Sequence, residues 1–203
     1  RGRDVPESER PAANLLFLIA VSGSMAVETK LPLVKLALHM LTEKLRPQDR
    51  VAVVVYAGSS GLVLKSTPGS ERAAILDAID RLEAGGSTDG GSGIELAYSV
   101  ARENFIDGGI NRVILCTDGD FNVGIIDREE LTKLVRARAE DKIALTALGF
   151  GADYNRDDML ETLADKGDGN YAYIDSDAEA RKVLVEQVGA TLQIIAKDVK
   201  IQV

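Results

Sequence analysis

A run of apolar residues that ends in two serines constrains the fold of this chain most. Leu15 to Val21 contains no polar side chain and is followed directly by Ser22, Gly23 and Ser24. A continuous apolar run of this length is typical of a parallel strand covered on both faces, and open α/β sheets bind ligands beyond the carboxyl ends of their strands. The sequence therefore predicts two hydroxyl groups at a binding position of an α/β sheet.

Further oxygen donors follow in two later segments. Thr88 lies in the glycine-rich segment 85–91, and Asp118 follows the largely apolar segment 113–117. Glycines permit positive φ angles and a close approach of one loop to another. Hydroxyl and carboxylate oxygens suit Mg²⁺, which is octahedral and keeps several water ligands. Ser22, Ser24, Thr88 and Asp118 are therefore candidate ligands for Mg²⁺, or for Mn²⁺ or Ca²⁺.

Apolar patterning alternates between strand-like and helix-like segments along the chain. Such alternation requires parallel strands joined by helical crossovers, which places helices on both faces of one sheet. We expect a doubly wound α/β fold, Rossmann-like, with a mostly parallel six-stranded sheet and one short antiparallel edge strand. The expected strands are 14–21, 50–57, 61–64, 112–117, 142–149 and 171–174, and the expected helices are 29–46, 70–82, 94–105, 127–139, 155–166 and 176–195.

The ends of the chain differ from its centre. Residues 1–13 are polar and contain two prolines, which predicts a linker, and residues 14–196 are predicted to form one domain. Residues 197–203 alternate in polarity, which predicts the start of a following strand. We therefore expect this chain to be a fragment of a longer protein.

Charge and composition narrow the possible partners. The formal net charge is −8 and no basic stretch is present, which argues against nucleic acid because phosphate contacts supply most of that affinity. No run approaches the roughly 20 apolar residues of a membrane span. The single cysteine, Cys116, excludes an intrachain disulfide. We expect a monomeric domain.

The candidate ligands also resemble a known motif. Their order and spacing are similar to the metal-ion-dependent adhesion site (MIDAS) of the von Willebrand factor type A (VWA) domain, over nearly the whole chain. That motif is Asp-x-Ser-x-Ser, then a Thr, then an Asp, and Ser22, Ser24, Thr88 and Asp118 match it. Ala20 stands where the family has its first aspartate. Segments 118–124 and 167–174 look most like a subgroup from bacterial cell-envelope proteins.

The resemblance implies a function. In the family an acidic side chain of a partner protein completes the metal's coordination, so this chain is expected to be a non-enzymatic protein-binding module for adhesion or scaffolding. Its expected location is extracytoplasmic, in a bacterial envelope. Loss of a carboxylate at position 20 typically weakens metal affinity about 10–100-fold, so we expect the metal to be weakly bound or absent. Retention of the other four residues favours a deliberate knockout over natural decay.

Two other functions remain open. A metal-independent scaffold domain of a larger envelope protein would use a different surface. A metal-dependent hydrolase would use Ser22 or Asp118 as a nucleophile, but the sequence offers no general base with an orienting group near either residue. The only histidine, His39, is expected to lie on a helix surface or to pack, and Cys116 is expected to pack as a small apolar residue.

A calcium loop after the central strand is a further, weaker hypothesis. Asp118, Asp120, Asn122 and Glu129 match positions 1, 3, 5 and 12 of an EF-hand loop. Val123 stands at position 6, where the sharp turn requires glycine. The segment also follows an expected strand and not a helix, which disfavours this interpretation.

Overall fold

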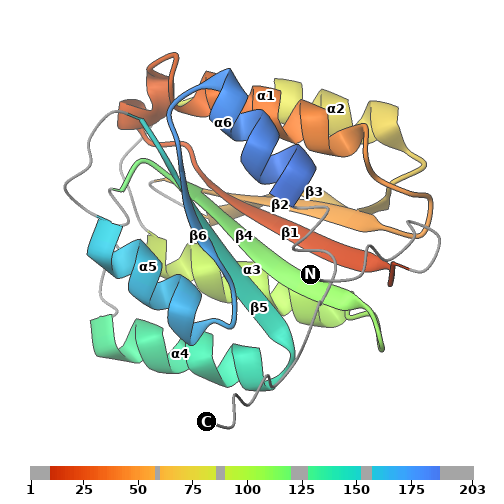
Figure 1. Ribbon diagram of the computed structural model, residues 1–203, viewed down its shortest axis with the longest axis vertical. Helices are drawn as coiled ribbons and strands as arrows, with labels where there is room; N and C mark the ends of the chain where they lie inside the picture. Colours follow the sequence, from red (N-terminus) through yellow and green to blue (C-terminus); the bar gives the residue numbers. More distant parts are fainter. Residues whose placement is uncertain (1–9, 58–59, 86–89, 120–127, 152–156, 188–203) are drawn as a thin grey trace, which may run out of the picture.

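The computed structural model describes residues 10–57, 60–85, 90–119, 128–151 and 157–187. Within these residues, six strands form one sheet in the order β3-β2-β1-β4-β5-β6 (Figure 1). The β2–β3 pair is antiparallel and every other pair is parallel. The strands are β1 (Ala13–Ala20), β2 (Arg50–Tyr56), β3 (Ser60–Pro68), β4 (Ile110–Thr117), β5 (Ile143–Phe150) and β6 (Tyr171–Ile174).

Helices cover both faces of this sheet. Figure 1 shows α1, α2 and α6 on one face and α3, α4 and α5 on the other. This arrangement confirms the predicted doubly wound fold. The helices are η2 (Gly23–Ala26), α1 (Leu31–Thr42), α2 (Arg72–Asp80), α3 (Gly90–Glu103), α4 (Arg128–Glu140), α5 (Asp157–Lys166), α6 (Asp177–Arg181) and η4 (Lys182–Gln187).

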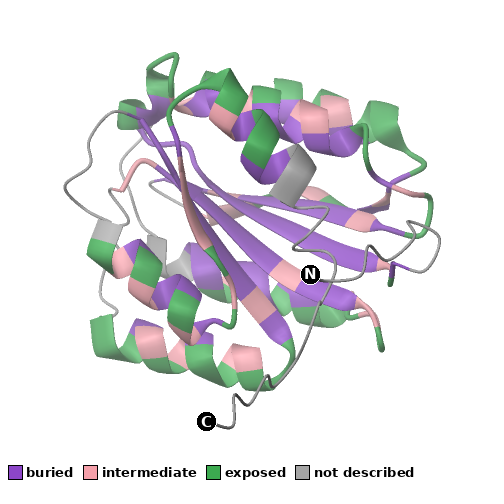
Figure 2. Cartoon of the chain, in the orientation of Figure 1, coloured by how far each residue is buried: buried purple, intermediate pink, exposed green. Residues whose placement is uncertain are grey.

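The strand β1 lies at the centre of the hydrophobic core. All eight of its residues are buried, and it pairs with β2 on one side and β4 on the other. Figure 2 shows that burial follows the strands and the inner faces of the helices. Burying a large apolar side chain such as Phe17 or Leu18 contributes about 1.5–3 kcal/mol each. The carboxyl end of β1 is therefore held firmly in place.

Two elements differ from the sequence prediction. The edge strand β3 is longer than the expected 61–64. Its outer side faces solvent, so its further residues are polar and show no apolar alternation from which a strand could be predicted. The helix α1 was expected to span residues 29–46. It follows Lys30 without a side-chain cap and ends at Thr42, whose hydroxyl donates to the Leu38 carbonyl over 2.8 Å.

The final helix is partly as predicted. The Ser176 hydroxyl accepts a hydrogen bond from the Glu179 amide at 3.4 Å and so caps α6 at the residue where the helix was expected to begin. The helix was expected to continue to about Ile195, and α6 and η4 together reach Gln187. Residues 188–203, including the strand expected at 197–203, lie outside the described residues.

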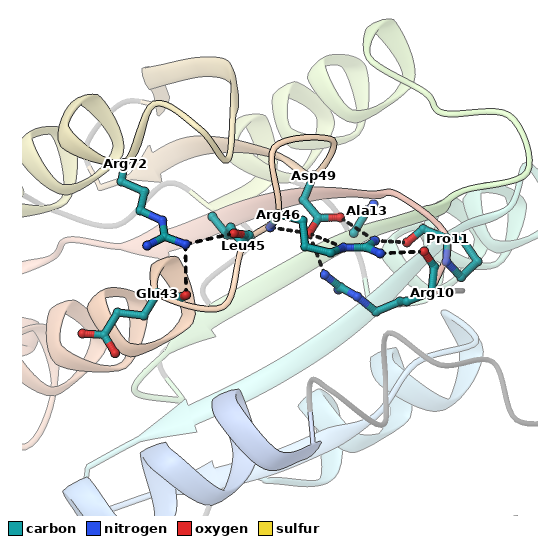
Figure 3. A network of polar contacts seen from close by, with 8 residues as sticks. All are labelled: Arg10, Pro11, Ala13, Glu43, Leu45, Arg46, Asp49 and Arg72. Atoms are coloured by element: carbon teal, nitrogen blue, oxygen red, sulfur yellow. Dashed lines mark hydrogen bonds and ion pairs between the residues drawn. The ribbon is translucent and has the colours of Figure 1, made fainter. Parts of the chain in front are cut away.

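A buried carboxylate joins the segment before β1 to the loop after α1 (Figure 3). Asp49 has no exposed surface, and it accepts hydrogen bonds from the Arg10 guanidinium at 2.6 Å and from the Ala13 and Arg46 amides at 3.0 and 2.9 Å. Arg46 also donates to the carbonyls of Arg10 and Pro11. We call Arg10, Ala13, Arg46 and Asp49 the Asp49 cluster. It makes residues 10–13 part of the packed domain, although 1–13 were predicted to be a linker.

The Asp49 cluster changes the acidity of its carboxyl group. Burial alone would raise the pKa of Asp49, because the charged form loses its hydration. Hydrogen bonds from Arg46 and Ala13, together with the charge of Arg10, outweigh that effect and lower the pKa below its ordinary value. The cluster therefore stabilises the ionised carboxylate at the amino end of β1, opposite the predicted ligand-binding end.

Candidate functional site at the carboxyl end of the sheet

The two serines lie in a short turn directly after β1. The Val21 amide donates to the Tyr56 carbonyl at 3.0 Å, and the Met25 amide donates to the Ser22 carbonyl at 2.9 Å. The Met25 side chain is fully buried and fixes the turn to the core. The hydroxyl oxygens of Ser22 and Ser24 lie 2.9 Å apart, with Ser22 buried and Ser24 exposed. The predicted pair of hydroxyl donors is therefore brought together.

Asp118 follows β4, which neighbours β1 in the sheet. Ile19 pairs with Cys116, so the two strands end side by side. The Asp118 side chain is 2% exposed, and its Oδ2 accepts a hydrogen bond from the Lys30 Nζ at 2.8 Å. Its Oδ1 is buried and has no hydrogen-bond partner among the described residues. Asp118 is thus a buried carboxylate at the predicted position, with one oxygen engaged by a lysine.

The surroundings of Asp118 are poorly hydrated. The Tyr56 side chain, at the end of β2, is fully buried. Burial raises the pKa of its phenol well above the ordinary value, the Thr117 side chain counteracts this, and the negative charge of Asp118 adds to the rise. The carboxylate of Asp118 therefore acts on its neighbours with little screening by water.

Lys30 is the site residue that the sequence interpretation missed. It occupies the N-cap position of α1, and its side chain is 18% exposed. A cation is disfavoured at this position, because the amino end of a helix carries partial positive charge. A lysine at the amino end of an expected helix was therefore the available signal in the sequence. Residues that are unfavourable for their local structure are often held by a contact elsewhere in the fold.

The two remaining positions of the predicted site are Ala20 and Thr88. Ala20 is the last residue of β1 and is 1% exposed, so only a methyl group stands where the motif has a carboxylate. Thr88 lies outside the described residues. The nearby described residue Gly85 donates its amide hydrogen to the Val21 carbonyl at 2.7 Å, which connects the end of the segment after α2 to the turn after β1.

The described donors do not fit a tightly bound divalent cation. Mg²⁺ sites in proteins depend on one or two carboxylates. Here Asp118 is the carboxylate, and the Lys30 ammonium already balances its charge. In the described part of the chain, no three His, Cys, Asp or Glu side chains gather in a group that could hold a metal ion. The weak metal binding expected from Ala20 stays a prediction.

The other candidate residues lie elsewhere or play structural roles. The His39 Nε2 bonds the Asp80 Oδ1 at 2.8 Å on the outer surface of α1 and α2, as expected for a surface histidine. Cys116 is 1% exposed within β4, and burial raises the pKa of its thiol. Its expected packing role is confirmed.

The structure also bears on the calcium-loop hypothesis. Glu129 lies in the first turn of α4, where its side chain is 80% exposed and pairs with Lys133 at 3.8 Å. Asp120, Asn122 and Val123 lie outside the described residues. Asp118 follows a strand, whereas an EF-hand loop follows a helix. The observed strand removes the structural context that this hypothesis required.

Comparison with known proteins identifies the family. Residues 14–187 match the von Willebrand factor type A domain. The chain therefore belongs to the VWA family. It is 47% identical over 201 residues to the uncharacterized protein YfbK of Escherichia coli (strain K12), a match that covers 99% of this chain and 35% of YfbK. The chain thus spans about a third of that relative's length.

Solved structures share the same fold. BatB, a conserved hypothetical protein from Bacteroides thetaiotaomicron, superposes with a TM-score of 0.72 at 20% identity, covering 89% of this chain and 98% of BatB. An aerotolerance-related membrane protein from Bacteroides fragilis gives a TM-score of 0.71 at 18% identity, covering 88% of this chain and all of that one. Among the described residues of the present chain, no helix is both long and apolar enough to cross a bilayer.

Proposed function

We propose that this chain is a non-enzymatic protein-binding module of a larger bacterial envelope protein, acting in adhesion or scaffolding. VWA domains are typically protein-binding modules, and YfbK, which is 47% identical to this chain, is a bacterial protein. The envelope location is supported by the fold shared with an aerotolerance-related membrane protein. The proposed partner surface is the carboxyl end of the sheet around Ser22, Ser24 and Asp118, with Thr88 as a further member.

One observation carries this proposal. The Ser22 and Ser24 hydroxyls lie 2.9 Å apart at the end of the buried strand β1, beside the strand that presents the buried Asp118. Polar groups held on a rigid strand end need little ordering when a ligand binds. The proposed partner presents an acidic side chain to this surface, as the family's mode of binding implies. A domain of this kind needs no contribution from a second copy, so we propose that it acts as a monomer.

Ala20 determines how strongly partner binding by this chain depends on a metal ion. The family's Mg²⁺ or Mn²⁺ site would use Ser22, Ser24, Thr88 and Asp118, and a bound ion would supply an open coordination position for a partner carboxylate. With a methyl group at position 20 we propose that this metal-dependent mode is weakened or disabled. The remaining hydroxyls and charges of the surface are then available for a metal-independent scaffold role.

The hydrolase hypothesis receives less support. A serine nucleophile needs a base within hydrogen-bond reach that is itself oriented by a third group. The hydrogen bond of Ser22 that the structure describes goes to another hydroxyl, and His39 is engaged with Asp80 on the helix surface. We therefore propose no catalytic residue.

A binding comparison tests the proposal. The chain and its Ala20→Asp variant would be immobilised and exposed to bacterial envelope extract, with Mg²⁺ or with EDTA, and captured proteins would be validated with purified material. The proposal expects the variant to capture a partner with exposed Asp or Glu in Mg²⁺ and to lose it in EDTA. Ser24→Ala in the same background should weaken capture. If neither EDTA nor the Ser24→Ala substitution reduced capture by the Ala20→Asp variant, a partner surface at this end of the sheet would be contradicted.

A further inference from the structure

The strongest unexplained contact at this end of the sheet joins Lys30 to Asp118. The two residues are 88 positions apart, and their charged atoms lie 2.8 Å apart. The carboxylate is 2% exposed and the lysine side chain 18%, so the pair is largely removed from solvent. Most surface ion pairs contribute little because water and salt screen them, whereas a buried carboxylate requires a partner. The Lys30–Asp118 pair is therefore a buried ion pair, in which the carboxylate requires its partner.

Lys30 lies directly before α1 in a loop conformation. Lys30 has φ −117° and ψ −106°, outside the regular helix and strand conformations, and it precedes α1 without a side-chain cap. A lysine also loses considerable rotamer freedom when it is fixed in one geometry. The contact with Asp118 is the compensating interaction that the structure shows.

The lysine side chain also has a defined path. It passes over Gly151, directly after β5, where an added Cβ would lie 2.9 Å from the lysine Cε and 3.4 Å from its Cγ. Gly151 has φ +113°, a conformation that side-chain-bearing residues rarely adopt. The glycine therefore leaves room for the lysine side chain, which extends from the amino end of α1 past the carboxyl end of β5 to Asp118 after β4.

The charges at this position balance without a metal ion. Asp118 contributes one negative charge, Lys30 contributes one positive charge, and Ala20, Ser22 and Ser24 contribute none. A divalent cation approaching Asp118 would meet a neighbouring ammonium in poorly hydrated surroundings, where like charges repel strongly. An aspartate at position 20 would change this balance in favour of a cation.

We propose that the Lys30 ammonium is the resident cation of this site. It neutralises Asp118 in the place where a divalent ion would otherwise act, and a metal ion binds there only in competition with it. This inference goes beyond the proposed function, because it concerns how the site is neutralised and requires no partner protein.

Metal titration of four proteins tests the competition. These are the chain itself, Lys30→Met, Ala20→Asp, and the double variant Ala20→Asp/Lys30→Met, each titrated with Mn²⁺ by calorimetry and by water-proton relaxation. We expect Lys30→Met to raise Mn²⁺ affinity at least tenfold, both in the chain itself and in the Ala20→Asp variant. The double variant should therefore bind most tightly. Mn²⁺ affinities that stay within twofold when Lys30 is replaced would overturn the proposal.

A neighbouring lysine supplies the matched control. Lys35 lies on α1, five residues after Lys30, and its Nζ donates to the Asp80 carbonyl on the exposed surface. Lys35→Met removes the same charge from a nearby position and should leave Mn²⁺ affinity unchanged. An equal gain from Lys35→Met would mean that net charge alone is responsible, which would also overturn the proposal.

Two further variants at position 30 keep the proposal testable if Lys30→Met does not fold. If Lys30→Met does not fold without metal, Lys30→Gln retains a hydrogen-bond donor and loses only the charge, whereas Lys30→Arg retains the charge. In the Ala20→Asp background we expect Lys30→Gln to bind Mn²⁺ at least tenfold more tightly than Lys30→Arg. Equal affinities would show that the charge at position 30 does not govern metal binding. None of these outcomes depends on whether the partner capture described above succeeds.

Discussion

Replacing Asp49 with asparagine should destabilise the domain strongly while leaving its shape almost unchanged. Oδ1 of Asp49 accepts from the Ala13 amide at 3.0 Å and from Arg46 at 3.2 Å, and an amide oxygen can still do so. Oδ2 accepts from Arg10 at 2.6 Å and from the Arg46 amide at 2.9 Å. Arg46 Nε also donates to Oδ2, at 3.4 Å. In Asp49→Asn an NH₂ group would face these three donors, so their hydrogen bonds and the carboxylate charge are lost.

The size of this loss follows from burial. Removing one partner of a buried ion pair typically costs about 3–5 kcal/mol, because the remaining charge stays desolvated. Asp49 has no exposed surface and Arg10 is 7% exposed, so the pair is buried and this range applies. For a domain of this size, each kcal/mol lowers the midpoint of thermal unfolding by about 2–4 °C. The expected decrease is therefore roughly 6–20 °C.

Urea unfolding followed by circular dichroism would measure the effect, since the chain has no tryptophan for fluorescence. The matched control is Asp80→Asn, which makes the same change in a carboxylate that is 61% exposed and paired with His39. An exposed pair contributes about 0–1 kcal/mol, so the control should change little. If Asp49→Asn cost no more than Asp80→Asn, the importance assigned to the Asp49 cluster would be refuted.

The pH dependence has a definite sign. The pKa of Asp49 is lowered in the folded protein, so its contribution to the free energy of unfolding is fully present above the unfolded pKa of about 3.9 and is lost as pH falls through the folded pKa. The difference in unfolding free energy between the parent chain and Asp49→Asn should therefore shrink below about pH 4. A difference that grew with acidification would contradict the lowered pKa.

Three further predictions concern other parts of the domain. Cys116 should react with a thiol reagent such as DTNB only after denaturant is added, because the thiol is buried and its pKa is raised; rapid reaction of the native protein would contradict its packing in β4. Gly169→Ala should lower the free energy of unfolding by about 1–3 kcal/mol, since an added Cβ would overlap the Leu145 carbonyl oxygen, and an unchanged urea midpoint would contradict this close approach. EDTA should leave the thermal midpoint of the parent chain within about 1 °C, whereas millimolar Mg²⁺ should raise that of Ala20→Asp through ligand linkage.

The sequence contained enough information for the fold because the apolar pattern follows from burial. The segment that became β1 is buried at every position, and the run from Tyr171 to Ile174 was predicted to the residue. The edge strand β3 was underestimated, because residues 65–68, beyond the predicted 61–64, are largely polar and the pairing of β3 with β2 is irregular. Edge strands bury one side only, so their pattern is weaker.

The candidate site was predictable in part for a different reason. Ser22, Ser24 and Asp118 lie directly beyond apolar strands, and parallel strands bring their carboxyl ends together. The contacts of Lys30 with Asp118 and of Arg10 with Asp49 join residues 88 and 39 positions apart. No periodicity records such pairs, because they depend on the path of the chain between the strands. The polar segment around Arg10 looked like a linker for the same reason.

The position of β1 between its two neighbours has a mechanical consequence. The Asp49 cluster holds the amino end of this eight-residue strand, and the candidate partner surface lies at its other end, about 26 Å away at roughly 3.3 Å per residue. A force applied between these two points would act along the strand. Hydrogen bonds to β2 and β4 cross that direction on both sides, so they would be loaded together in shear and not opened one after another. Such a geometry suits a domain that must remain folded while its attachment points are pulled apart.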